Sequence, residues 1–229
     1  QYLEDGVVDI AIVGENLLVE KNKKVRVLEK LGFSKCRLAL AIPKGVKTEG
    51  PSYFKGKKIA TSYPNTVRKY FADKNIQTDI HVISGSVEIA PNIGLADGIC
   101  DVVSTGSTLF KNGLKETDVV LTSEAVMASS MNLSVEHQEI LDRLIFRIKA
   151  VLRAKNTKYI LMNLPNDKIE EVSAILPVLK SPTILPLAQP GWSSLHSVID
   201  EDKFWEVIDA LKAAGAEGIL VAPIDKIVR

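Results

Sequence analysis

The sequence predicts an α/β protein with two α/β lobes around a cleft and a smaller C-terminal domain. Short apolar runs typical of buried strands alternate with segments of helical periodicity through the 229 residues. The chain leaves the first lobe near Pro43 and returns to it through the apolar segment 118–128. The expected bounds are 1–43 and 117–154 for lobe I, 44–116 for lobe II, and 155–229 for the C-terminal domain.

Composition and charge favour an ordinary globular enzyme. The chain is 46% hydrophobic and 25% charged, with a net charge of +1, so nothing favours binding to nucleic acid or to a membrane surface. We find no apolar run of about 18 residues and no signal peptide, and we expect a cytoplasmic location. Cys36 and Cys100 lie in apolar runs and are expected to be buried free thiols, without zinc-site spacing.

The first lobe begins with a predicted buried strand at residues 7–13, which ends in Gly14, Glu15 and Asn16. Open α/β sheets bind ligands at the carboxyl ends of their strands, although a purely structural turn fits these residues equally well. The chain starts without Met, in a segment that resembles a helix end stopped by Gly6. We therefore expect that an earlier part of the protein precedes this sequence.

Residues 101–109 carry the strongest functional signal. An apolar strand at 99–103 is followed by small and hydroxylated residues and then by a helical turn, a junction suited to holding an anion. Asp101 would repel a phosphate unless a cation or a sugar hydroxyl lies between them. The pattern therefore favours a ribose phosphate with Mg²⁺, whereas a Ser/Thr-rich helix cap is the structural alternative.

Two other residues lie at predicted strand ends. Tyr63 follows a strand at 58–62 and precedes a helix that begins at Pro64, where it is either a packing aromatic or a ligand contact. Glu88 has apolar neighbours, and a buried carboxylate needs a partner. It is either an acid at a helix N-terminus or a group that converges with Asp101 on ribose hydroxyls or on Mg²⁺.

The C-terminal residues alternate in the order βαββαβ, which predicts a ferredoxin-like domain. Strands are expected at 158–162, 183–187, 192–199 and 218–222, and helices at 166–179 and 202–214. This part has no catalytic constellation of its own. It is therefore expected to serve as an oligomerisation platform, as a ligand sensor, or as both.

The blocks at 59–64, 85–91, 94–101 and 104–108, in this order and spacing, closely resemble ATP phosphoribosyltransferase, and the resemblance runs through the whole chain. It implies two periplasmic-binding-protein-like lobes and transfer of phosphoribosyl from phosphoribosyl pyrophosphate (PRPP) to N1 of ATP, with release of pyrophosphate. This reaction is the first step of histidine biosynthesis. The departures are the missing start and Asn163, which stands where some relatives have an acidic residue.

The resemblance also assigns site residues. It implies that PRPP is bound by Asp101, Ser104, Thr105, Gly106, Ser107 and Thr108, that ATP is bound by Tyr63 and Glu15, and that Glu88 and Asp101 are catalytic and contact Mg²⁺. A C-terminal domain is typical of the long form of the family, which histidine inhibits by feedback. The implied histidine contacts are Asn163, Leu179, Ser181, Thr183 and Gly218.

The implied assembly is a homo-oligomer, from dimer to hexamer. Two alternatives come from other classes of protein: a catalytically inactive regulatory paralogue, and a two-lobed small-molecule binding protein. Chemical turnover distinguishes the enzyme from both, because ligand binding alone does not.

Overall fold

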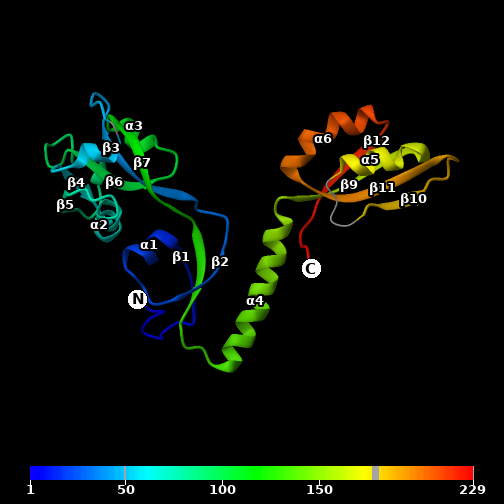
Figure 1. The fold of residues 1–229 in the computed structure, drawn as a ribbon. Helices are drawn as coiled ribbons and strands as arrows, with labels where there is room; N and C mark the ends of the chain where they lie inside the picture. Colours follow the sequence, from blue (N-terminus) through cyan, green and yellow to red (C-terminus); the bar gives the residue numbers. More distant parts are fainter. Residues whose placement is uncertain (49, 177–180, 229) are drawn as a thin grey trace. The chain divides into compact units, whose positions relative to one another are not determined.

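The computed structural model describes residues 1–48, 50–176 and 181–228. The chain divides into two compact units, residues 1–137 and residues 138–229, and the division falls within helix α4 (Val135–Ala154; Figure 1). The Oγ atom of Ser134 accepts a hydrogen bond from the backbone N–H of His137 at 3.2 Å and so caps the start of this helix. None of the described helices is long and apolar enough to cross a membrane.

The larger sheet of the first unit has the strand order β5-β4-β6-β3-β7. Strand β4 runs parallel to β5 and β6, whereas β3 runs antiparallel to β6 and β7. The strands are β3 (Cys36–Pro43), β4 (Lys58–Thr61), β5 (Asp79–Val82), β6 (Gly98–Val103) and β7 (Leu114–Ser123). Its helical segments are η1 (Pro51–Phe54), α2 (Pro64–Ala72), η2 (Val87–Ile89) and α3 (Ser107–Lys111).

The smaller sheet of the first unit has the order β1-β8-β2, with both pairings antiparallel. It consists of β1 (Ile10–Gly14), β2 (Arg26–Lys30) and β8 (Ala125–Ser129), and α1 (Glu15–Glu20) follows β1 directly. The first strand begins at Ile10 instead of residue 7. Ile10 and Ile12 are exposed, contrary to the expected burial, because β1 is an edge strand of a sheet with only three strands.

Strand pairing corrects the expected lobe boundaries at 43 and 117. Both β3 and β7 belong to the five-stranded sheet, so the chain changes sheets between β2 and β3 and again at Glu124. The physical reason is the burial of β3, which lies between two partner strands. Its residues Leu38, Leu40 and Ile42 are at most 1% exposed and pack with Phe54 and Phe71.

The second unit confirms the ferredoxin-like prediction. Its antiparallel sheet has the order β10-β11-β9-β12, and α5 and α6 pack on it through an apolar core. The elements are β9 (Thr157–Pro165), η3 (Asn166–Lys168), α5 (Ile169–Ile175), β10 (Thr183–Pro186), β11 (Trp192–Asp200), α6 (Glu201–Ala213) and β12 (Glu217–Pro223). Helix α5 ends at Ile175, before the expected end at 179, and residues 177–180 lie outside the described part of the chain.

Both cysteines are free, as expected. Cys100 is fully buried in β6, where burial raises the pKa of its thiol well above the ordinary value. Cys36 is only half-buried at the start of β3, which corrects the expected burial of this thiol.

Candidate active site

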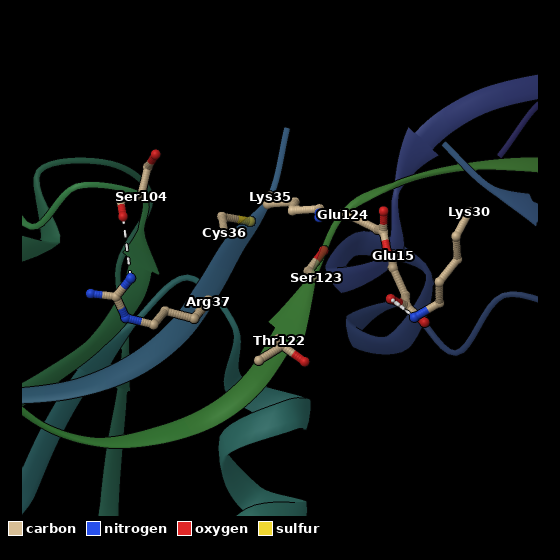
Figure 2. A pocket seen from close by; sticks show the side chains of 9 residues that line it. All are labelled: Glu15, Lys30, Lys35, Cys36, Arg37, Ser104, Thr122, Ser123 and Glu124. Carbon is tan, nitrogen blue, oxygen red and sulfur yellow. Dashed lines mark hydrogen bonds and ion pairs between the residues drawn. The ribbon is translucent and has the colours of Figure 1, made fainter. Parts of the chain in front are cut away.

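A cavity of about 430 Å³ lies in the first unit, where β3 and β7 leave the five-stranded sheet. It includes Glu15 and Ser104 from the predicted site residues. Figure 2 shows the complete lining: Glu15, Lys30, Lys35, Cys36, Arg37, Ser104, Thr122, Ser123 and Glu124. Three of these side chains are cationic and two are anionic.

Two ion pairs organise the charges around this cavity. Lys30 Nζ lies 3.0 Å from Glu15 Oε2. The Arg37 guanidinium holds Glu116 in a bidentate pair, with both N–O distances at 2.6 Å, and hydrogen bonding to Glu116 raises the pKa of Arg37. A third Arg37 nitrogen, Nη1, donates to the backbone carbonyl of Ser104 at 3.2 Å (Figure 2). Arg37 therefore ties the predicted phosphate loop to β3 and β7.

The predicted phosphate loop lies between β6 and α3. Its backbone turns at Gly106, where φ is +80° in the left-handed region that favours glycine. The Thr105 hydroxyl is 3.2 Å from the Ser107 hydroxyl and accepts a weak bond from the Ser107 N–H at 3.4 Å. Ser104, Thr105, Ser107 and Thr108 are all exposed, so their hydroxyl groups are open to a ligand.

The carboxylates of Asp101 and Glu88 are close enough to influence each other. Burial raises the pKa of Asp101, a hydrogen bond from the Val102 N–H at 2.7 Å opposes this shift, and the negative charge of Glu88 adds to it. Asp101 is half-buried on β6, and Glu88 is half-buried in η2. Two negative charges held together favour a cation or hydroxyl donors between them.

Tyr63 lies at the junction of β4 and α2, as expected. Its hydroxyl accepts a hydrogen bond from Asn16 Nδ2 at 3.0 Å. Burial raises the pKa of Tyr63, and the negative charge of Asp101 adds to the shift. The phenol is therefore protonated at neutral pH, and it lies within electrostatic range of Asp101.

The site residues differ in their relation to the cavity. Tyr63, Glu88 and Asp101 are absent from its lining, although Asn16 connects Tyr63 to the lining residue Ser123 through a hydrogen bond of 3.1 Å. The sequence reasoning missed the cationic residues Lys30, Lys35 and Arg37. In the sequence, these residues lie shortly before the apolar run at 38–43, and this position was the feature that could have identified them.

The implied histidine contacts form two groups in the second unit. The side chain of Asn163 on β9 lies beside Gly218 on β12, where an added Cβ would be 3.5 Å from Asn163 Nδ2. Thr183 lies on β10, at the opposite edge of this sheet, where it pairs with His196 on β11. Ser181 lies two residues before Thr183, and Ser181 and Thr183 are both exposed. Leu179 lies outside the described residues.

The described residues contain no group of three or more His, Cys, Asp or Glu side chains that could hold a metal ion. A pair of carboxylates still fits Mg²⁺, because this ion commonly takes one or two protein carboxylates and completes its shell with substrate phosphates and water. Asp101 lies on β6, just before the loop at 104–108, and the charge of Glu88 acts on its carboxylate.

Comparison with known proteins identifies the family. The family model for ATP phosphoribosyltransferase matches residues 1–150, and the model for the HisG C-terminal domain matches residues 154–226. An ATP phosphoribosyltransferase of Cytophaga hutchinsonii is 58% identical over 228 residues, which span 100% of this chain and 80% of the relative. One from Bacteroides fragilis is 54% identical, with 100% and 81% covered.

A solved structure agrees with this assignment. The ATP phosphoribosyl transferase (HisG:HisZ) complex from Thermotoga maritima aligns with a TM-score of 0.56 and 32% identity. The alignment covers 63% of this chain and 70% of that one. With the C-terminal domain of the long form, the chain therefore belongs to the ATP phosphoribosyltransferase family, whose reaction transfers phosphoribosyl from PRPP to N1 of ATP in the first step of histidine biosynthesis.

Proposed function

We propose that the loop at 104–108 binds the 5-phosphate of PRPP and that Asp101 binds the ribose hydroxyls. The observation that carries this proposal is the junction of β6 and α3, where Gly106 has the left-handed conformation and exposed hydroxyl groups surround it. Such a turn allows backbone N–H groups to approach a phosphate closely. Asp101 precedes this turn on the same strand, β6.

Glu88 and Asp101 are the residues that would hold Mg²⁺ in this site. Their mutual repulsion, which contributes to the raised pKa of Asp101, is relieved by a cation between them. When bound, Mg²⁺ supplies positive charge that neutralises the departing pyrophosphate. The carboxylates would also stabilise positive charge on the ribose ring as the bond from C1 to pyrophosphate breaks.

For ATP, we propose that Tyr63 packs near adenine and that Glu15 lies at the same end of the cleft. Support comes from the hydrogen bond of Tyr63 to Asn16, the residue next to Glu15. Lys35 is exposed in the cavity lining, and it forms no ion pair within the described residues. Its ammonium group is therefore available to the polyphosphate of a substrate.

In the reaction, N1 of ATP displaces pyrophosphate from C1 of PRPP, and the protein forms no covalent bond to either substrate. The protein must hold the two polyanionic substrates in the geometry in which N1 of ATP faces C1 of PRPP. The phosphate loop and Asp101 would hold the ribose at both ends, while Tyr63 presents the base. This division of labour uses the hydroxyl, carboxylate and cationic groups that line the described site, and it requires no covalent intermediate.

We also propose that the C-terminal domain binds histidine as a feedback inhibitor and that the chain forms a homo-oligomer. Support for an effector site comes from two of the implied histidine contacts, Asn163 on β9 and Gly218 on β12, which are neighbours in the sheet where the pairing of the two strands is irregular. Large apolar side chains on this domain are exposed, including Trp205 at 71% and Leu220 at 60%, which is typical of an interface. Histidine inhibits only if it binds a less active arrangement more tightly.

One assay tests these proposals together. The protein is mixed with ATP, PRPP and Mg²⁺, and the absorbance change is followed with and without histidine, and again after Mg²⁺ is chelated. We expect turnover that depends on Mg²⁺ and is suppressed by histidine. Turnover that histidine does not change would refute the regulatory proposal, and turnover that survives chelation would refute the role of Glu88 and Asp101 toward Mg²⁺.

A further inference from the structure

Helix α1 carries two buried polar side chains that reach the larger sheet. Asn16 and Glu20 are only 8% and 6% exposed, and their spacing of four residues places them on one face of the helix. A buried carboxylate is costly unless hydrogen bonds replace the water that it loses. Glu20 therefore needs dedicated partners.

These partners are at the start of α2. The Glu20 carboxylate accepts hydrogen bonds from the backbone N–H of Asn65 at 3.0 Å, from the backbone N–H of Thr66 at 2.9 Å and from the Thr66 hydroxyl at 2.7 Å. The backbone carbonyl of Glu20 accepts a fourth bond from Asn65 Nδ2 at 3.0 Å. The last residue of α1 is thus joined to the first turn of α2.

The backbone donors of the first turn of α2 account for this arrangement. Tyr63 is the N-cap residue, and its side chain makes no capping hydrogen bond. Pro64 has no N–H, and the N–H of Val67 donates to the Tyr63 carbonyl at 3.1 Å. Only the N–H groups of Asn65 and Thr66 need other acceptors, and each receives one oxygen of Glu20. Glu20 therefore caps α2 from outside the helix, and its charge favours the helix N-terminus.

The same helix also holds the Tyr63 ring. Asn16 Nδ2 donates to the Tyr63 hydroxyl, and Asn16 Oδ1 accepts from the Ser123 hydroxyl at 3.1 Å. The Tyr63 N–H donates to Thr61 Oγ1 at 2.9 Å. The position of Tyr63 is thus determined at its hydroxyl by Asn16 and at the adjoining helix start by Glu20.

We propose that Glu20 is a positioning residue for ATP, which acts through Tyr63 by capping α2. This inference rests on the proposed function, in which Tyr63 packs near adenine. Without the carboxylate, the backbone N–H groups of Asn65 and Thr66 lose their acceptors, and the start of α2 must shift toward water or another partner. The PRPP loop is tied to Arg37 through Ser104 instead, so the effect is specific to ATP.

The first test is Glu20→Gln. A glutamine keeps one acceptor oxygen and replaces the other with an NH₂ donor, so one of the two N–H groups faces a donor instead of an acceptor. We expect KM for ATP to rise about tenfold, the order of effect of losing a helix cap, while KM for PRPP stays unchanged. Glu136→Gln is the matched control, because Glu136 is an exposed acid in the first turn of α4. Equal rises in both KM values, or no rise in that for ATP, would overturn the inference.

A double-mutant cycle distinguishes this inference from the proposal on which it rests. If Glu20 acts through Tyr63, adding Glu20→Gln to Tyr63→Ala leaves KM for ATP at the value of Tyr63→Ala alone. If the two substitutions raise KM for ATP by factors that multiply, Glu20 does not act through Tyr63, although Tyr63 keeps its role with ATP. If Tyr63→Ala has a normal KM for ATP, its proposed place near adenine is wrong, and the inference is refuted with it.

A milder variant keeps the test decisive if Glu20→Gln does not fold. Thr66→Val removes only the hydroxyl bond to Glu20 and keeps both backbone bonds. It should raise KM for ATP about twofold to threefold, as expected for one hydrogen bond, and leave KM for PRPP unchanged. An unchanged KM for ATP in a folded Thr66→Val protein would contradict the proposed role of the cap.

Discussion

Gly106→Ala tests whether the left-handed turn of the phosphate loop is required for PRPP binding. At Gly106 φ is +80°, and an added Cβ would meet no atom closer than Val103 Cγ1 at 4.0 Å. The substitution therefore causes no steric clash. Its cost is conformational, about 1–2 kcal/mol for an alanine in the left-handed region.

This cost has two possible outcomes, and both can be measured. If the loop keeps its conformation, the free energy of unfolding falls by about 1–2 kcal/mol, which urea denaturation detects. If the loop relaxes to negative φ, the phosphate loses its backbone donors, and KM for PRPP rises about 5-fold to 30-fold. In both cases KM for ATP is expected to stay constant, because Tyr63 belongs to a different strand and helix.

Gly113→Ala provides the control. Gly113 has φ of +70° and open space around its Cα, so the substitution carries the same conformational cost. It follows α3 at the end away from the loop, and it should lower stability without changing KM for PRPP. The left-handed turn at Gly106 is not required for PRPP binding if Gly106→Ala changes neither stability nor KM for PRPP, or if Gly113→Ala changes KM for PRPP equally.

Three further substitutions separate packing, charge and loop support. Gly98→Ala should destabilise the protein by about 1–3 kcal/mol in urea denaturation, because its Cβ would lie 2.7 Å from Phe54 Cε1 and 2.8 Å from a backbone oxygen; unchanged stability would contradict this. Asp101→Asn should reduce kcat about 100-fold or more while stability at neutral pH stays equal or increases, because the folded pKa of Asp101 is raised above 3.8. Folding then favours the protonated carboxyl, so the contribution of Asp101 to stability falls as the pH rises from the ordinary pKa of Asp through the raised pKa. Asp101→Asn removes this pH dependence. A variant that unfolds, or that turns over normally, would contradict the role given to Asp101. Arg37→Lys cannot keep both the bidentate pair with Glu116 and the bond to Ser104. Steady-state kinetics should therefore show a higher KM for PRPP. An unchanged KM for PRPP would mean that Arg37 does not position the loop.

Local patterns predict the junction of β6 and α3 well. An apolar run followed by Ser, Thr and Gly is enough to place a strand, a turn and a helix start, because each step depends on neighbouring residues. Gly106 has the left-handed backbone conformation that glycine adopts without strain. The ferredoxin-like domain was predictable for the same reason, since its elements alternate without interruption.

Pairing between distant segments was not predictable in this way. The apolar run at 38–43 is typical of a strand, but its sheet depends on pairing with β6 and β7, which follow much later in the chain. Arg37 illustrates the consequence, because its partner Glu116 is 79 residues away. The capping of α2 by Glu20, at a separation of 45 residues for Asn65, leaves no local signal either.

The arrangement of strands would allow one region to bind two polyanions, as the proposed site requires. Strands β4 and β6 run parallel, so their carboxyl ends lie at the same edge of the sheet, and α2 and α3 both begin there. Each helix start directs unpaired N–H groups toward this edge. At α2 the backbone donors already bind Glu20, and the half-buried ring of Tyr63 lies at that junction. At α3 the hydroxyl-rich loop is open. The same β-to-α connection can therefore present a ring for a base in one case and donors for a phosphate in the other.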